Sequence, residues 1–149
     1  MLTKTLSLTA AAVLALLAGA AAATETTHTV QMLNRGEAGA MVFEPAYIAA
    51  QPGDTITFVP TDRGHNAATI EGILPEGAEA FEGAMGEEVS ITVTEEGLYG
   101  IQCDPHAAMG MVAVIQVGEA TNLEAVTAAA EDLRGKAKER FQDALTQVQ

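Results

Sequence analysis

Between about Thr26 and Gly118 the chain alternates polar and apolar residues in short runs that are separated by turn residues. The alternation is clear over residues 29–33, 55–58 and 89–94. A period of two residues is typical of strands with one buried face and one exposed face. Residues 111–117 are apolar on both faces, which predicts an interior strand. With glycines and Pro75-Glu-Gly77 as turns, the pattern predicts an all-β sandwich whose loops carry the functional groups.

After Gly118 the composition changes to Ala, Glu, Lys and Leu, which favours helices. Thr121 or Asn122 is positioned to cap a first helix, Gly135 to interrupt it, and a second helix is expected from about Lys136 to Gln147. The apolar positions of the first helix are Leu123, Val126, Ala130 and Leu133, and those of the second are Phe141, Leu145 and Val148. We expect both helices to pack against the sandwich rather than to bind a partner.

The first 23 residues have the pattern of a secretory signal peptide. Lys4 precedes an apolar run from Ala10 to Ala22, and Ala21-Ala-Ala23 fits a cleavage site. The run is too short to span a bilayer, and no later segment is long and apolar enough to do so. The sequence therefore predicts a signal peptide over residues 1–23 and one domain over residues 24–149, with C-terminal helices from about residue 121.

The chain is strongly acidic, with 20 Asp and Glu against 7 Lys and Arg and a formal net charge of −13. Loss of Lys4 with the signal peptide would bring the net charge to about −14, which attracts a positively charged partner and repels an acidic one. The sign of the charge excludes nucleic acid as a partner.

One short segment, residues 99–111, gathers the only cysteine, a histidine and two methionines. Cys103 and His106 are three residues apart and Met111 follows five residues later, with Pro105 and Gly110 shaping the turn. Thiolate and thioether ligands favour copper over hard cations. A single loop does not complete a site, and His65, which follows a predicted strand and a turn, is a better remaining ligand than His28.

Other interpretations of the same residues are less well supported. A lone cysteine is often a buried structural thiol, but Cys103 is accompanied by His106, Met111 and His65 at the spacing of a ligand set. A catalytic Cys-His dyad lacks a placed Asn or Asp and an oxyanion hole, and zinc sites rarely use a thioether. A copper carrier or storage protein without a redox role is the remaining alternative, although such sites are often richer in Met or His.

Two motifs carry a resemblance to a known family. Gly64-His65-Asn66 followed by Cys103-x-x-His106-x-x-x-x-Met111 resembles the cupredoxins with a short ligand loop, which are the plastocyanins and pseudoazurins. Within that pair the chain is most similar to the pseudoazurin family, and the resemblance extends from about Thr26 to Gln147. The stretches that carry it are Met32-Leu-Asn-x-Gly36, Gly39-Ala-Met-Val-Phe-Glu-Pro-Ala-Tyr47, Pro52-Gly-Asp54, Pro75-Glu-Gly-Ala-Glu79 and Met109-Gly-Met111.

The resemblance implies a cupredoxin-like Greek-key β-sandwich with two C-terminal α-helices and one type 1 copper ion, Cu(I) or Cu(II). Trigonal ligation by two histidines and a cysteine with a weak axial methionine is the arrangement of blue-copper electron-transfer sites. The implied ligands are His65, Cys103, His106 and Met111, which leaves Met109 as a packing residue.

Three further residues are expected around the ligands. In the family, the asparagine at the position of Asn66 ties the two ligand loops together, and its backbone amide donates to the cysteine sulfur. Met41 matches the methionine that lies against the exposed ligand histidine, here His106. Asp104 replaces a small hydroxyl residue, and its carboxylate should favour Cu(II) and lower the reduction potential.

The implied function is a periplasmic, monomeric carrier of single electrons, not an enzyme. The electron would leave through His106 and an apolar docking patch of Pro105, Ala107 and Ala108 with Met41. A ring of lysines that surrounds the copper in some family members is reduced here to Arg35 and Arg63, with Gln102, Glu82 and Glu87 in the same region. The expected partners are a c-type cytochrome or the cytochrome bc1 side as donor, and copper nitrite reductase or nitrous oxide reductase as acceptor.

Overall fold

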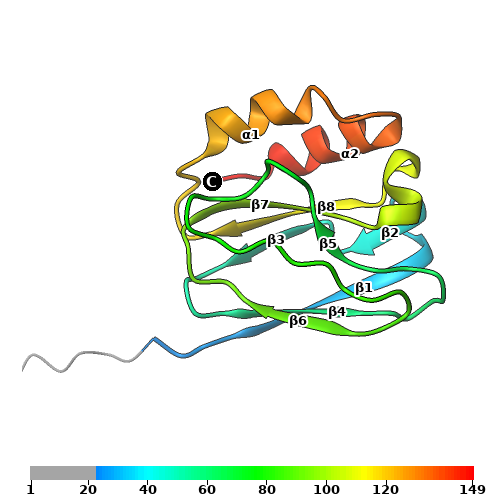
Figure 1. Ribbon diagram of the computed structural model, residues 1–149, viewed down its shortest axis with the longest axis horizontal. Coiled ribbons are helices and arrows are strands. Elements are labelled where there is room, and N and C mark those ends of the chain that lie inside the picture. The colour runs from blue at the N-terminus through cyan, green and yellow to red at the C-terminus, as the bar shows by residue number, and fades with distance from the viewer. Residues whose placement is uncertain (1–22) are drawn as a thin grey trace, which may run out of the picture.

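Two four-stranded sheets face each other in the computed structural model, which describes residues 23–149 of the 149-residue chain. Two short helices cover the outer face of one sheet, so that the molecule has three layers (Figure 1). Nearly all of the predicted signal peptide lies outside the described residues. The expected sandwich with two C-terminal helices is confirmed.

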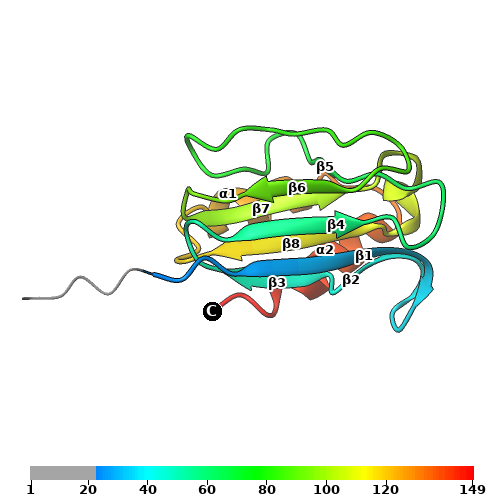
Figure 2. The ribbon, with the colours of Figure 1, turned by 90° about the horizontal axis from the view of Figure 1, so that it is seen from below.

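The two sheets differ in strand order but share a mixed architecture. In the first sheet the order is β2-β1-β4-β6, which Figure 2 shows with β1 and β4 between the two edge strands, and β1 pairs with β4 in parallel. In the second sheet the order is β3-β8-β7-β5, with β3 parallel to β8. The strands are β1 Thr27–Gly36, β2 Gly39–Glu44, β3 Tyr47–Ala50, β4 Thr55–Val59, β5 Ala68–Thr69, β6 Val89–Thr92, β7 Gly97–Gln102 and β8 Val112–Val117.

The core fills the space between the sheets and continues beneath the helices. Every residue of β8 is buried, because β8 packs on the facing sheet on one side and on the helices on the other. This confirms the predicted interior strand. Phe141 of the second helix is fully buried in the same core cluster as Leu98 and Val114 of the second sheet. Full burial of a side chain of this size contributes about 1.5–3 kcal/mol, which explains why both helices pack on the sandwich as expected.

The helices begin and end slightly differently from the prediction. Helix α1 spans Leu123–Ala130 and α2 spans Lys136–Leu145, and Gly135, with φ 60°, separates them. Of the two predicted capping residues, Asn122 is the one at the start of α1. Asn122 lies at the cap position, but its side chain accepts a hydrogen bond from the Leu98 amide at 2.7 Å and donates to the Leu98 carbonyl at 3.0 Å. The Asn122 side chain thus satisfies the backbone amide and carbonyl of Leu98 in β7 instead of the first amides of α1.

The sandwich has two unlike ends. The described chain starts at one end, and the 3₁₀ helix η1, Asp104–Met109, lies at the other beside the turn between β1 and β2 (Figure 1). Neither α1 nor α2 is long and apolar enough to cross a bilayer, and the same holds for every helix of residues 23–149.

Candidate metal centre

Three potential metal ligands from separate parts of the chain meet at the η1 end. The Nδ1 atoms of His65 and His106 are 3.2 Å apart, and the Cys103 sulfur lies 3.7 Å from the first and 3.5 Å from the second. A triangle with these sides has its centre about 2 Å from each corner, which is the length of metal–nitrogen bonds in proteins. Among residues 23–149, no other group of three or more His, Cys, Asp or Glu side chains lies close enough together to hold a metal ion.

The backbone of the loop is fixed at both ends of η1. Cys103 lies between β7 and η1 in an extended conformation, and Gly110 ends η1 with φ 96°, a left-handed conformation that favours glycine. The Cys103 amide donates to the Met111 carbonyl at 3.0 Å, and the Met111 amide donates to the His106 carbonyl at 3.2 Å. The short loop therefore closes on itself as the Pro105 and Gly110 spacing indicated.

Asn34 orients the ring of His65. The Asn34 side-chain Oδ1 atom accepts a hydrogen bond from His65 Nε2 at 2.8 Å, and the Asn34 backbone amide donates to Asp62 Oδ2 at 2.7 Å. A proton on Nε2 leaves the Nδ1 lone pair free to face the cluster. This role of Asn34 was not predicted from the sequence. The only signal was that Asn34 belongs to the Met32-Leu-Asn stretch.

The electrostatics of the cluster favour a bound cation. Burial lowers the pKa of His65, and the charge of a protonated His106 would lower it further, although Asp62 opposes both effects. Burial raises the pKa of the Cys103 thiol, and hydrogen bonds from the backbone amides of Asn66 and His106 oppose that rise. A metal ion supplies the positive charge that a buried thiolate needs, so that its binding would displace the thiol proton.

Asn66 joins the two ligand loops, as the family resemblance implied. Its Oδ1 accepts from the Asp104 amide at 2.9 Å, and its Nδ2 donates to Asp104 Oδ2 at 2.6 Å and to the Gly83 carbonyl at 3.1 Å. The second oxygen of the Asp104 carboxylate accepts from Gln102 Nε2 at 3.0 Å. Asp104 is therefore held beside the cysteine by two side-chain amides.

The three methionines near the site differ in exposure. Met111 is fully buried in the same core cluster as Cys103, and Met41, with φ 52°, packs half-buried against that cluster. Met109 is 46% exposed, so that its assignment as a packing residue is wrong. Side chains three residues apart align along a 3₁₀ helix, and Met109 therefore extends the half-buried His106 side of η1 toward solvent. The expected contact between Met41 and His106 stays a prediction.

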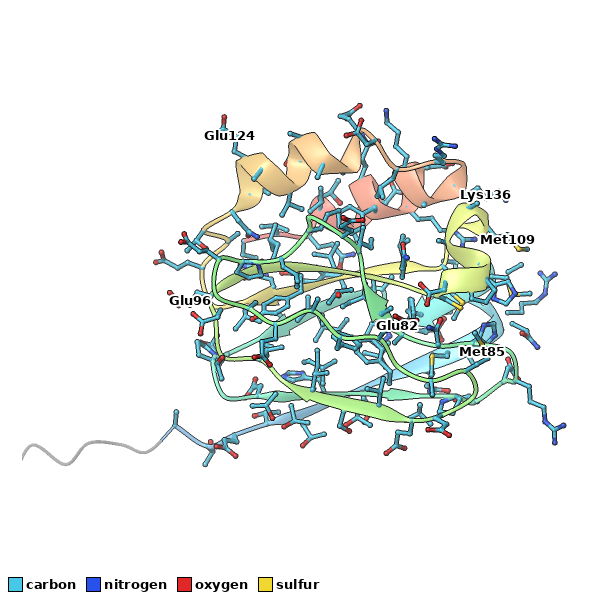
Figure 3. All side chains as sticks on the ribbon, in the orientation of Figure 1. Glu82, Met85, Glu96, Met109, Glu124 and Lys136 are labelled. Carbon is cyan, nitrogen blue, oxygen red and sulfur yellow. The ribbon has the colours of Figure 1, made fainter. Side chains whose placement is uncertain are left out.

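The surface at this end combines apolar residues with a few charges. Pro105 and Ala108 are exposed and Ala107 is half-buried, and Met85, 53% exposed, lies at the same end as Met109 (Figure 3). Met85 was not predicted from the sequence to lie here. Its loop is tied to the site by a hydrogen bond of 2.8 Å from the Gly86 amide to the His65 carbonyl. Arg35 and Arg63 are both exposed.

Comparisons with known proteins agree with this geometry. A model of the copper-binding proteins of the plastocyanin/azurin family matches residues 30–118. The chain is 54% identical to a pseudoazurin from Paracoccus pantotrophus over 140 residues, which cover 93% of this chain and 95% of the relative. It is 47% identical to a putative pseudoazurin from Rhizobium leguminosarum bv. viciae over 113 residues, which cover 75% of this chain and 74% of the relative. The solved pseudoazurin structure from Methylobacterium extorquens AM1 superimposes with a TM-score of 0.79 at 41% identity, covering 83% of this chain and 99% of that chain.

Proposed function

The chain belongs to the pseudoazurins of the plastocyanin/azurin family, which are copper electron carriers, and from this premise we propose how it holds its copper and which partners it serves. The observation that carries the proposal is the convergence of two imidazole nitrogens and the cysteine sulfur around one point. Soft ligands in a trigonal set with a thioether nearby are typical of type 1 copper. The proposed ligands are His65, Cys103, His106 and, weakly, Met111.

The surrounding residues hold the proposed ligands in one arrangement. Asn34 fixes the ring of His65, and Asn66 ties the His65 loop to the Cys103 loop through Asp104. When bound, copper supplies a one-electron exchange between its two oxidation states. Ligands that are hydrogen-bonded and buried rearrange little during this exchange, which favours rapid transfer. Since side chains occupy all the proposed positions, the role is that of a carrier rather than of an enzyme.

The exposed edge of His106 is the proposed exit for the electron. His106 is half-buried, whereas His65 and Cys103 are fully buried, so that His106 is the ligand nearest to solvent. Pro105, Ala107 and Ala108 surround it with apolar surface, and the exposed Met85 and Met109 extend that surface. A small apolar patch of this kind suits the weak, short-lived encounters of electron-transfer proteins.

The charge of the chain favours a basic partner. With 20 acidic and 7 basic residues, it attracts a positively charged protein over long range, and only Arg35 and Arg63 provide positive charge from the positions of the family's lysine ring. We propose a c-type cytochrome as the electron donor and copper nitrite reductase or nitrous oxide reductase as the acceptor, in the periplasm. Complete burial of His65, Cys103 and Met111 disfavours the alternative of an exchangeable copper store.

Stopped-flow kinetics test this function. A reduced basic cytochrome c is mixed with the copper(II)-loaded protein, and oxidation of the haem is followed at several salt concentrations. We expect rapid second-order oxidation that slows at least about tenfold between low and high salt, because salt screens the attraction between opposite charges. A Cys103→Ser variant should not accept the electron. Rates that are independent of salt would contradict the proposed partner, and a wild-type protein that accepts no electron would contradict the carrier function.

A further inference from the structure

Arg140, in the middle of α2, reaches from the C-terminal helix to the ligand end of the sandwich. Its Nη1 atom donates to the carbonyls of Ala40, Met41 and Gly110 at 3.0, 2.9 and 3.1 Å, and Nη2 donates to the Ala38 carbonyl at 3.3 Å. One half-buried guanidinium thus joins three segments that are far apart in sequence, which are α2, the β1–β2 hairpin and the end of η1. In Figure 1, α2 lies next to η1 at this end of the molecule.

In the described part of the chain, no carboxylate lies within ion-pair distance of this guanidinium. Among residues 23–149 the ion pairs are His28–Asp54 and Lys138–Glu131, so that Arg140 binds backbone carbonyls only. A planar group with several N–H donors is suited to fixing carbonyls from different segments at once, whereas lysine presents a single ammonium on a flexible stem.

Two of the four carbonyls belong to peptides that set the positions of methionines near the site. The Gly110 carbonyl is part of the planar peptide that leads into Met111, so that fixing this oxygen fixes the direction in which Met111 leaves the loop. The side chain also lies against the Gly110 Cα, since a Cβ built there would be only 2.6 Å from Arg140 Cδ. Any other residue at this point would displace the Arg140 side chain and would be strained at the φ of 96°.

Met41 is the second methionine. It has φ 52°, a left-handed conformation that is uncommon for a residue other than glycine. The β1–β2 register pairs Leu33 with Val42 and Arg35 with Ala40 but omits the position between them, where Asn34 would face Met41. The Met41 carbonyl is bound by Arg140 at this interruption, while the Asn34 side chain binds His65.

We propose that Arg140 is a positioning residue of the copper site, which sets the placement of Met111 and Met41 through the carbonyls of Gly110 and Met41. The inference builds on the proposed ligand set, because it assigns Met111 as the axial ligand. Its geometric part, the fixing of the Gly110–Met111 peptide, applies to the copper-free protein as well.

The test compares Arg140→Met and Arg140→Lys with Arg134→Met. Arg134 is an exposed residue between α1 and α2 whose side chain makes no hydrogen bond within residues 23–149, so that it controls for loss of an arginine. The copper-free proteins are compared by the backbone amide chemical shifts of Met111 and Met41. The copper(II)-loaded proteins are compared by their absorption and paramagnetic resonance spectra, and all are checked by thermal unfolding.

We expect Arg140→Met to shift both amide resonances, to alter the copper(II) spectra and to lower copper(I) affinity by about tenfold, a loss typical of groups that support metal ligands. Arg140→Lys should recover part of each effect, and Arg134→Met should cause none. Lower thermal stability with unchanged amide shifts and unchanged spectra would overturn the proposal and leave Arg140 as a structural cross-link.

The remaining outcomes are also decisive. If Arg140→Met does not fold, Arg140→Lys decides by the same readouts, since it keeps the charge and a donor but loses the planar fork. If the wild-type protein forms no thiolate–copper(II) centre, the proposed ligand set fails. The copper-free amide shifts then still show whether Arg140 sets the Gly110–Met111 peptide, and unchanged shifts would overturn that role.

Discussion

His28 and His65 are both held at Nε2 by a side-chain oxygen, yet their surroundings give them different chemistry. The carboxylate of Asp54 lies 2.9 Å from His28 Nε2, whereas the neutral amide oxygen of Asn34 lies 2.8 Å from His65 Nε2. The neutral amide oxygen of Asn34 accepts the Nε2 proton of a neutral ring and leaves Nδ1 of His65 free to face the cluster, whereas the carboxylate of Asp54 joins His28 to the start of β1. The oxygen partner therefore separates a structural histidine from a metal-binding one.

The His28–Asp54 and His65–Asn34 pairs also lie at opposite ends of the sandwich. Asp54 accepts hydrogen bonds from the backbone amides of Thr26 and Gln51 as well as from His28, and these bonds hold the beginning of β1 in place. His65 instead faces His106 and Cys103 across 3.2 and 3.7 Å. In the first arrangement three N–H groups bind the Asp54 carboxylate, and in the second two ring nitrogens and a sulfur are directed at one point.

Replacing each histidine by glutamine should have the most unequal effect. We expect His65→Gln to weaken copper(II) binding by more than about 100-fold, beyond the loss seen when only a supporting group is removed, because a ligand is lost. His28→Gln should leave copper binding unchanged. Copper titrations followed by visible absorption measure both, and equal losses in the two variants would contradict the assignment of His65.

Exchanging the oxygen partner sharpens the comparison. Asn34→Asp gives His65 a carboxylate like that of His28, which should favour protonation of its ring and make copper binding depend more steeply on pH. Asn34→Ala should lower copper affinity by about 10–100-fold. Copper affinities at several pH values test both variants. Wild-type affinity in Asn34→Ala would show that the amide does not position the ring.

The Asp54 end should determine part of the acid stability. Hydrogen bonds from the Gln51 amide, His28 and the Thr26 amide lower the pKa of Asp54 to about 2. A carboxyl whose folded-state pKa is depressed stabilises the fold above its unfolded-state pKa, and this contribution is lost as pH falls from about 4 to about 2. Asp54→Asn should unfold at a lower temperature than wild type at pH 7 and lose less stability over that window. Thermal unfolding between pH 2 and pH 7 measures this, and parallel curves for the two proteins would contradict it.

The smallest expected effect concerns Asp104, a carboxylate at the copper end that is held by amides. Asp104→Thr should raise the reduction potential by about 10–40 mV, because an exposed charge contributes no more than about 1 kcal/mol and about 59 mV, or about 1.4 kcal/mol, corresponds to tenfold in a one-electron equilibrium. Glu96→Gln, at the opposite end of the molecule (Figure 3), is the control and should leave the potential unchanged. Voltammetry decides, and an unchanged or lower potential in Asp104→Thr would contradict the role of the carboxylate.

Much of this organisation is predictable from the sequence, because period-two alternation and soft ligands at fixed spacing are local signals. The interior strand β8, the helix-breaking Gly135 and the grouping of Cys103 with His106 all follow from such signals. His65 required the additional step of choosing between two distant histidines. The family resemblance further indicated that Asn66 ties the loops.

The contacts that sequence reasoning missed depend on tertiary pairing. Asn34 reaches His65 only because β1 pairs with β2 and β4, and Arg140 binds Met41 across 99 residues of sequence. Asn122 carries a normal capping residue type, but the neighbouring backbone of β7 competes successfully for its side chain. Such contacts leave no periodic pattern in the sequence.

A visible absorption spectrum of the protein with one equivalent of copper(II), recorded before and after ascorbate, tests the central claim most directly. The proposed ligand set predicts an intense band in the red that is bleached by reduction and restored by an oxidant, because a thiolate bound to copper(II) absorbs strongly while copper(I) does not. A colourless or faintly blue protein would show that Cys103 does not bind copper(II), and would contradict the assignment of this cluster as a type 1 centre.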